Sequence, residues 1–127
     1  MVKNTFLDGI YKDAVAFFLK TMEEKISDIV AKLPVNHDDL LQQINSATIA
    51  IESTPYYCIM KFYHNGISEV FYDKTIEIQV VCENLPPTVF HMYLSNGVLY
   101  EFEYFKADSS KINDEELFVG EVMFEIF

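Results

Sequence analysis

The amino-acid sequence predicts an α+β fold in which an N-terminal amphipathic helix, or a helix pair, packs on one antiparallel sheet of about five to seven strands. Three observations predict it: apolar residues at helical spacing in the first third of the chain, a change to twofold alternation after residue 45, and two Asn-Gly dipeptides. With 127 residues, half of them hydrophobic, the chain can bury a core without disulfides. We expect one domain over residues 1–127, helical in 1–45 and sheet-forming in 46–127.

Residues 4–33 have the pattern of an amphipathic helix. A continuous helix of this length would extend about 43 Å at 1.5 Å per residue, which is more than a small sheet can cover. We therefore expect one bent helix or two, with a break near Lys20 or Thr21. The apolar stripe consists of Leu7, Tyr11, Ala14, Phe18, Met22, Ile26, Ile29 and Leu33.

A short further helix is expected after Pro34, which ends the first pattern. Asn36 or Asp38 can cap it through a side-chain oxygen, and its apolar positions are Leu40, Leu41 and Ile44.

Twofold alternation predicts strands in the rest of the chain. Asn65-Gly66 and Asn96-Gly97 indicate tight hairpin turns, because both residue types tolerate the positive φ of a type I′ turn. Gly120 is expected to mark a bulge or kink in the last strand. We expect a meander from the fourth, fifth and sixth of the predicted strands, which span residues 48–51, 57–63, 69–72, 75–82, 88–94, 98–105 and 117–126.

The net charge and the distribution of apolar residues limit the classes of partner and the location that we expect for the chain. Nine basic and twenty acidic residues give a formal net charge of -11, which repels phosphate backbones and anionic membrane surfaces. No uncharged apolar run approaches the roughly 20 residues of a membrane-spanning helix. Charged residues also interrupt the opening segment where a signal peptide would be apolar. We expect neither nucleic-acid nor membrane binding, and a cytoplasmic location.

Sequence motifs for catalysis, metal binding or cofactor binding are not found. His37, His64 and His91 lack metal-ligand spacing, and Cys58 and Cys82 form no CxxC pair, which favours reduced, buried thiols. The sequence has no nucleophile elbow and no glycine-rich phosphate-binding loop. No catalytic residue, metal or cofactor is predicted, and a non-enzymatic role is favoured.

The most distinctive local pattern is the strand predicted at 98–105. Alternation places Glu101 and Glu103 on one face of this strand. The residues on the other face are Tyr100, Phe102 and Tyr104.

Counting inward from the Asn-Gly turn sets Tyr93 opposite Tyr100 and His91 opposite Phe102. In that register His91 shares the aromatic face, so a glutamate–histidine pair is not expected.

Paired carboxylates suit a solvated face, a surface for a cationic partner or, as the least favoured reading, acid–base or cation chemistry. Glu77 and Gln79 have the same parity in the neighbouring strand and widen the polar face. Tyrosine is frequent in the sheet segments and suits an interface that is partly wet. The last 27 residues contain eight acidic and two basic residues, a field that can steer a basic protein.

Two segments resemble a group of small uncharacterised bacterial proteins. These are 40–44, Leu-Leu-Gln-Gln-Ile, and 96–110, which fit the patterns "LL.Qi..a" and "G.LyELEiyraDgs.i". Glu101, Glu103 and Asp108 match, whereas Phe102 stands for the usual leucine and Ser109 for the usual glycine. The resemblance implies a role of the immunity type, which is suspected for such small acidic proteins, and supplies no established activity.

Together these observations lead us to expect a bacterial cytosolic interaction protein, immunity-like, whose acidic, Tyr-rich sheet face binds a basic protein. The first alternative is a small ligand-binding protein or enzyme with an acidic site at Glu101 and Glu103. The second is a structural homodimer formed through the amphipathic helix. The candidate binding residues are Glu77, Tyr100, Glu101, Glu103, Tyr104 and Asp108.

Overall fold

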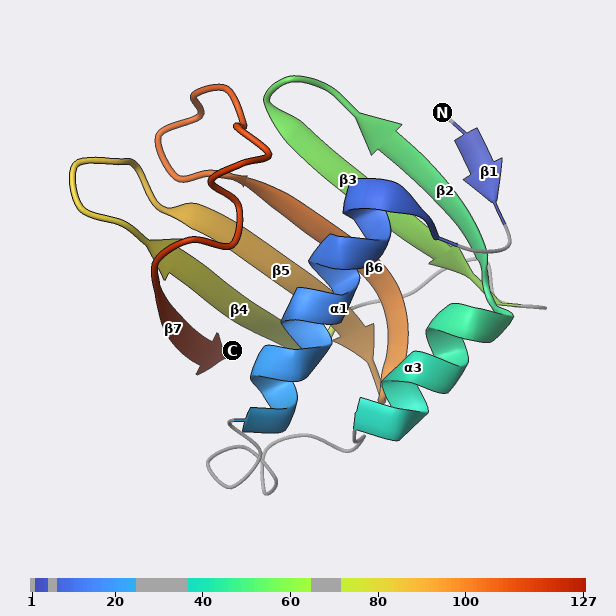
Figure 1. Cartoon of the computed structure of the whole chain (residues 1–127). Coiled ribbons are helices and arrows are strands. Elements are labelled where there is room, and N and C mark those ends of the chain that lie inside the picture. Colours follow the sequence, from blue (N-terminus) through green and yellow to red (C-terminus); the bar gives the residue numbers. More distant parts are fainter. Residues whose placement is uncertain (1, 5–6, 25–36, 65–71) are drawn as a thin grey trace.

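The computed structural model describes residues 2–4, 7–24, 37–64 and 72–127 (Figure 1). They form a seven-stranded antiparallel sheet of order β1-β2-β3-β6-β5-β4-β7, together with two helices. This confirms the predicted α+β class. The elements are β1 (Val2–Asn4), α1 (Gly9–Glu24), α3 (His37–Ser46), β2 (Thr48–Ser53), β3 (Tyr57–Tyr63), β4 (Lys74–Val81), β5 (Thr88–Ser95), β6 (Val98–Lys106) and β7 (Glu121–Ile126).

Both helices lie on the same face of the sheet (Figure 1). Helix α1 buries one stripe against the strands, and the Phe18 ring meets Phe102 edge to face, with centroids 5.3 Å apart. Helix α3 buries Leu40 and Ile44. In the described part of the chain no helix covers the other face, and neither α1 nor α3 has the length and apolar character needed to cross a membrane.

The side chain of Gln43 fastens α3 to the β5–β6 hairpin. Its Nε2 donates a hydrogen bond to the carbonyl of Gly97 at 2.9 Å, and its Oε1 accepts one from the backbone N–H of Leu99 at 2.7 Å. A single amide thus satisfies both a donor and an acceptor of the hairpin end. This long-range contact gives Gln43, the second glutamine of the segment Leu-Leu-Gln-Gln-Ile, a structural role.

The first helix differs from its prediction at its start and near its middle. Val2–Asn4 form the edge strand β1 paired with β2, so the helix begins at Gly9 and not at Asn4. Pairing gives these backbone groups partners on the sheet edge. The predicted break near Lys20 or Thr21 is wrong, because α1 continues through both residues to Glu24. The predicted continuation to residue 33 lies outside the described residues.

The strand predictions are largely confirmed. Strands β4, β5 and β6 form the expected meander, and Asn96 and Gly97 have φ of 49° and 82°, as a type I′ turn requires. The first Asn-Gly turn and most of the strand predicted at 69–72 fall outside the described residues, and Tyr72 itself belongs to no strand. The last strand begins at Glu121 and not at residue 117, directly after Gly120.

Candidate functional site

A β-bulge in strand β6 determines which side chains meet on the uncovered sheet face. Leu94 pairs with Leu99, but Tyr93 pairs with Glu101, which leaves Tyr100 as an extra residue. The bulge lets Leu99 and Phe102, three positions apart, both point to the helical side, where both are fully buried.

The predicted register beyond the turn is therefore wrong by one residue. His91 lies opposite Glu103, and not opposite Phe102. The glutamate–histidine pair that simple alternation disfavoured is present.

The His91 cluster consists of Glu77, Gln79, His91, Tyr93 and Glu103, from three neighbouring strands. His91 Nε2 lies 2.7 Å from Glu77 Oε2, and its Nδ1 lies 3.0 Å from the Tyr93 hydroxyl oxygen and 3.3 Å from Glu103 Oε1. The Tyr93 hydroxyl donates to Glu103 Oε1, and Gln79 Nε2 donates to Glu77 Oε1 at 2.8 Å. Both imidazole nitrogens thus have an acceptor within reach.

The pKa shifts favour the protonated form of His91 between two carboxylates. Hydrogen bonding to Glu103 raises the pKa of His91 above its usual range, against an opposing effect of burial, and Glu77 adds to the rise. The hydrogen bond from His91 in turn lowers the pKa of Glu103. Burial tends to raise the pKa of Glu77, but the hydrogen bonds from His91 and Gln79 outweigh it, so that this pKa is lowered. Burial, and then Glu103, raise the pKa of Tyr93, which stays neutral.

The hydrogen bonds within the cluster disfavour acid–base catalysis by its members. A general acid or base works best when its pKa lies near the working pH and its proton faces a substrate. Here both imidazole nitrogens and both carboxylates already take part in hydrogen bonds within the cluster, so none of these groups is left facing a substrate. The cluster therefore suits a structural role that fixes the surface around it.

Replacing His91 by glutamine should remove a pH-dependent part of the stability. The raised pKa means that protonated His91 stabilises the fold fully below the pKa of the unfolded imidazole, and that this contribution is lost as pH rises through the folded pKa. As pH falls through the lowered pKa values of Glu77 and Glu103, these carboxylates become protonated, and the stabilisation is lost in acid as well. The difference in unfolding free energy between wild type and His91→Gln should be largest at about pH 5 to 6 and should shrink above about pH 7.

Urea denaturation of both proteins between acid and mildly alkaline pH measures this difference. A difference that is constant with pH, or that grows as pH rises, would contradict the imidazolium arrangement.

Glu101 lies beside the cluster on the same face but has a different environment. Burial, and then the charge of Glu103, raise its pKa, while Lys61 opposite it on β3 acts to lower it. Within the described residues its carboxylate accepts no hydrogen bond. It is a half-buried acid whose only nearby compensating charge among these residues is a lysine on an exposed position.

A tyrosine stack borders this carboxylate. The rings of Tyr72 and Tyr93 stack with centroids 5.3 Å apart, and Tyr72 is 44% exposed. Burial, and then the charge of Glu101, raise the pKa of Tyr72, so its hydroxyl remains neutral at neutral pH. Glu101 with this stack offers negative charge next to an aromatic surface, the combination that suits an arginine or lysine side chain.

The structure brings three of the six predicted site residues together on the open face, namely Glu77, Glu101 and Glu103. Tyr104 is not among them: it points to the helical side and is 2% exposed. Tyr100 is the bulged residue, with its ring 5.6 Å from the His64 ring and edge-on to it.

Asp108 also lies apart from the three carboxylates, in the turn after β6. It is exposed, and its Oδ1 accepts a hydrogen bond from the backbone N–H of Ser110. Ser109, the next residue in this turn, has a φ of 64°. Asp108 therefore shapes a turn, since an aspartate bonded two residues ahead is a common turn device.

His91 and Tyr93 are the site residues that the sequence analysis placed on the wrong face. Among the described residues, no group of three or more histidine, cysteine, aspartate or glutamate side chains is arranged to hold a metal ion. Comparison of the chain with protein-family models, with curated proteins and with solved structures finds no match.

Proposed function

We propose that this chain is a non-enzymatic protein-binding module whose open sheet face binds a basic protein. One observation carries the proposal: the sheet face opposite the helices is uncovered among the described residues and combines an under-compensated carboxylate, Glu101, with exposed tyrosine rings.

The charge of this face supports a basic partner. The alternating registers place six glutamates on it, against Lys3, Lys61 and the internally bonded His91. Complementary charge speeds encounter with a basic protein and selects against acidic ones. The six are Glu52, Glu77, Glu101, Glu103, Glu121 and Glu125.

The apolar content of the same face supports a protein partner over a free ion. Tyr63 and Tyr72 are 46% and 44% exposed, and Met123 and Phe127 at the β7 edge are 57% and 59% exposed. Aromatic residues and methionine are enriched in protein interfaces, where they bury large areas. Acidic groups around such residues form the polar rim that an interface requires.

The two alternatives have less support. Among the described residues, two clefts on the helical side are lined by neither Glu101 nor Glu103, so the acidic pair offers no enclosed substrate site in them. The apolar stripe of α1 is buried within the monomer, so a helix-mediated homodimer would need a different surface.

The immunity-like role fits this surface. A toxin that acts on nucleic acid carries a basic surface for phosphate, and an acidic sheet face can occupy that surface by charge complementarity. We place the protein in the bacterial cytosol, where such a toxin would be neutralised.

A charge-reversal pair tests the proposal. Glu101→Lys should weaken binding to a basic partner by about tenfold or more, because it places a cation at the centre of the acidic face. Glu24→Lys makes the same charge change at an exposed position at the end of α1, on the helical side, and should leave binding unchanged. Partners captured from a lysate of the native host are compared for the two variants by quantitative mass spectrometry.

The affinity of each captured protein is then measured at low and moderate salt. A basic protein lost with Glu101→Lys, retained with Glu24→Lys and weakened by salt supports the proposal. Equal recovery by both variants, or recovery of acidic partners alone, contradicts it.

A further inference from the structure

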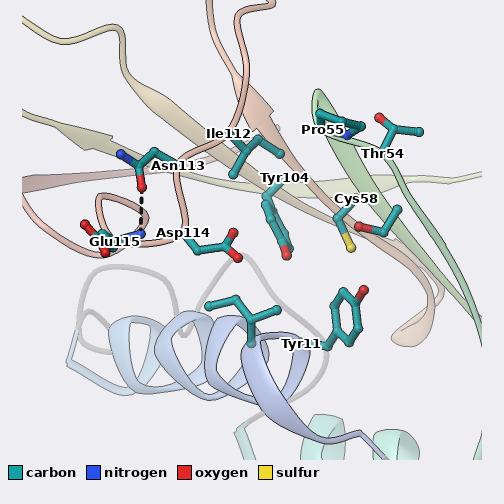
Figure 2. Close-up of a pocket in the computed structure, with 11 residues that line it drawn as sticks. Tyr11, Thr54, Pro55, Cys58, Tyr104, Ile112, Asn113, Asp114 and Glu115 are labelled. Atoms are coloured by element: carbon teal, nitrogen blue, oxygen red, sulfur yellow. Dashed lines mark hydrogen bonds between the residues drawn. The ribbon is translucent and has the colours of Figure 1, made fainter.

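A cleft of about 520 Å³ opens on the helical side of the sheet, away from the proposed interface (Figure 2). Its walls come from α1, the β2–β3 turn, strands β3 and β6, and the loop after β6. This volume is in the range of sites that hold small organic molecules. The side chains that could contact a ligand in this cleft include those of Ile10, Tyr11, Cys58, Tyr104, Ile112 and Asp114.

Tyr104 supplies a buried polar group aimed into this cleft. The residue is 2% exposed, and Figure 2 shows its hydroxyl pointing into the space between Cys58, Tyr11 and Asp114. Burial, and then Cys58, raise the pKa of Tyr104, so its hydroxyl stays protonated. Among the described residues, the side chain that interacts with that hydroxyl is the Cys58 thiol, which is a weak hydrogen-bonding group. The hydroxyl therefore retains capacity to bond a ligand.

The Cys58 thiol is part of the floor and not a nucleophile. It is 1% exposed, and burial raises its pKa to about 11 against the opposing hydrogen bonds of Tyr104 and Ser53. At neutral pH a thiol with this pKa holds its proton, and the thiolate is the reactive form. The cleft is thus suited to binding and not to covalent chemistry.

The charge lining the cleft is negative. Asp114 is exposed at the mouth, and Figure 2 shows its carboxylate turned toward Tyr104. Its charge contributes to the raised pKa values of both Cys58 and Tyr104, which places it within electrostatic reach of the floor. The described residues that line the cleft include Glu115 as a second acid and no lysine, arginine or histidine.

We propose that this cleft binds a small primary amine with a compact apolar body. The ammonium group pairs with Asp114 and donates to the Tyr104 hydroxyl, while the apolar body packs on Ile10, Ile112 and the ring of Tyr11. A carboxylate at the mouth selects a cation, and Ile10 and Ile112, in a lining that is otherwise mostly polar, offer contacts to a short apolar body. This site is independent of the open sheet face, so either proposal can fail without the other.

Three probes with one apolar body and different head groups test the site: phenethylamine, phenethyl alcohol and hydrocinnamate. Binding to the full chain is followed by two-dimensional NMR. We expect the amine to bind about tenfold more tightly than the alcohol, and the carboxylate to bind more weakly than either. Shifts should concentrate at Tyr11, Cys58, Tyr104 and Asp114.

Two neutralising variants of the same loop separate a specific site from general attraction to an acidic protein. Asp114→Asn should weaken amine binding by about tenfold, while Asp108→Asn, which keeps an oxygen for the Ser110 turn, should leave it unchanged. Both variants keep the backbone spectrum of the wild type if they fold normally. No amine binding at low-millimolar concentration, equal affinity for the three probes, or equal loss in both variants would overturn the proposal.

Discussion

Replacement of Phe90 by alanine is expected to lower the free energy of unfolding by about 3 to 5 kcal/mol. Phe90 is fully buried on β5, and its ring centroid lies 5.6 Å from that of Phe17, 6.2 Å from Phe118 and 5.5 Å from Tyr104. These rings come from α1, from the loop before β7 and from β6. Truncation therefore opens a cavity where three parts of the structure meet, and the surrounding rings can collapse only partly.

Urea denaturation measures the loss, with Phe127→Ala as the matched control. Phe127 is 59% exposed, and its contacts to β4 are backbone hydrogen bonds with Thr75 that alanine retains. The control should cost less than about 0.5 kcal/mol. Similar losses of unfolding free energy in the two variants would mean that the helices and the sheet do not share a core around Phe90.

The fold class was predictable because local signals and the tertiary structure agree. Alternation identified strands, and the Asn96-Gly97 turn has the positive φ values that its residue types favour. The start of α1 was missed because the competing state is a long-range pairing: Val2–Asn4 gain backbone partners on β2, whose residues lie more than 40 positions away. Periodicity within residues 4–33 contains no information on that partner.

The sequence predicted that the acidic residues of the candidate site share one sheet face, but it did not predict that His91 lies on the same face. Parity alone placed Glu101 and Glu103 together, and the structure retains this. The position of His91 depends on the bulge at Tyr100, and a single inserted residue reverses the facing of everything beyond it. A signal was present: Leu99 and Phe102 are both strongly apolar yet three apart, which strict alternation cannot bury on one face.

Contacts between distant segments were beyond sequence reasoning altogether. The Gln43 side chain bonds the hairpin 54 and 56 positions away. The cleft on the helical side, for which we propose amine binding, likewise combines Tyr11, Cys58, Tyr104 and Asp114 from four separate segments. A residue-by-residue reading shows no spacing that would unite them, because their proximity follows from how α1 and the loop after β6 pack on the sheet.

Replacement of Gly120 by alanine is expected to destabilise the protein by about 2 to 4 kcal/mol. Gly120 has a φ of 147°, which side chains of L-residues rarely adopt, and a Cβ placed there would lie 2.5 Å from the carbonyl oxygen of Val81. That oxygen belongs to β4 at the position where β7 begins to pair with it. The added methyl group must therefore push β7 away from the sheet edge, and both the strain and the lost pairing oppose folding.

Gly9→Ala separates the steric part of this effect from the conformational part. Gly9 also has a positive φ, of 55°, but a Cβ there would meet no atom within 4 Å. It should cost only about 1 kcal/mol, so the excess loss in Gly120→Ala measures the clash with Val81. Hydrogen exchange shows where Gly120→Ala weakens the sheet: amides of the β4–β7 pairs should lose protection before those of β5 and β6. Equal losses in the two variants would show that backbone conformation alone, and not close approach to β4, requires glycine at position 120.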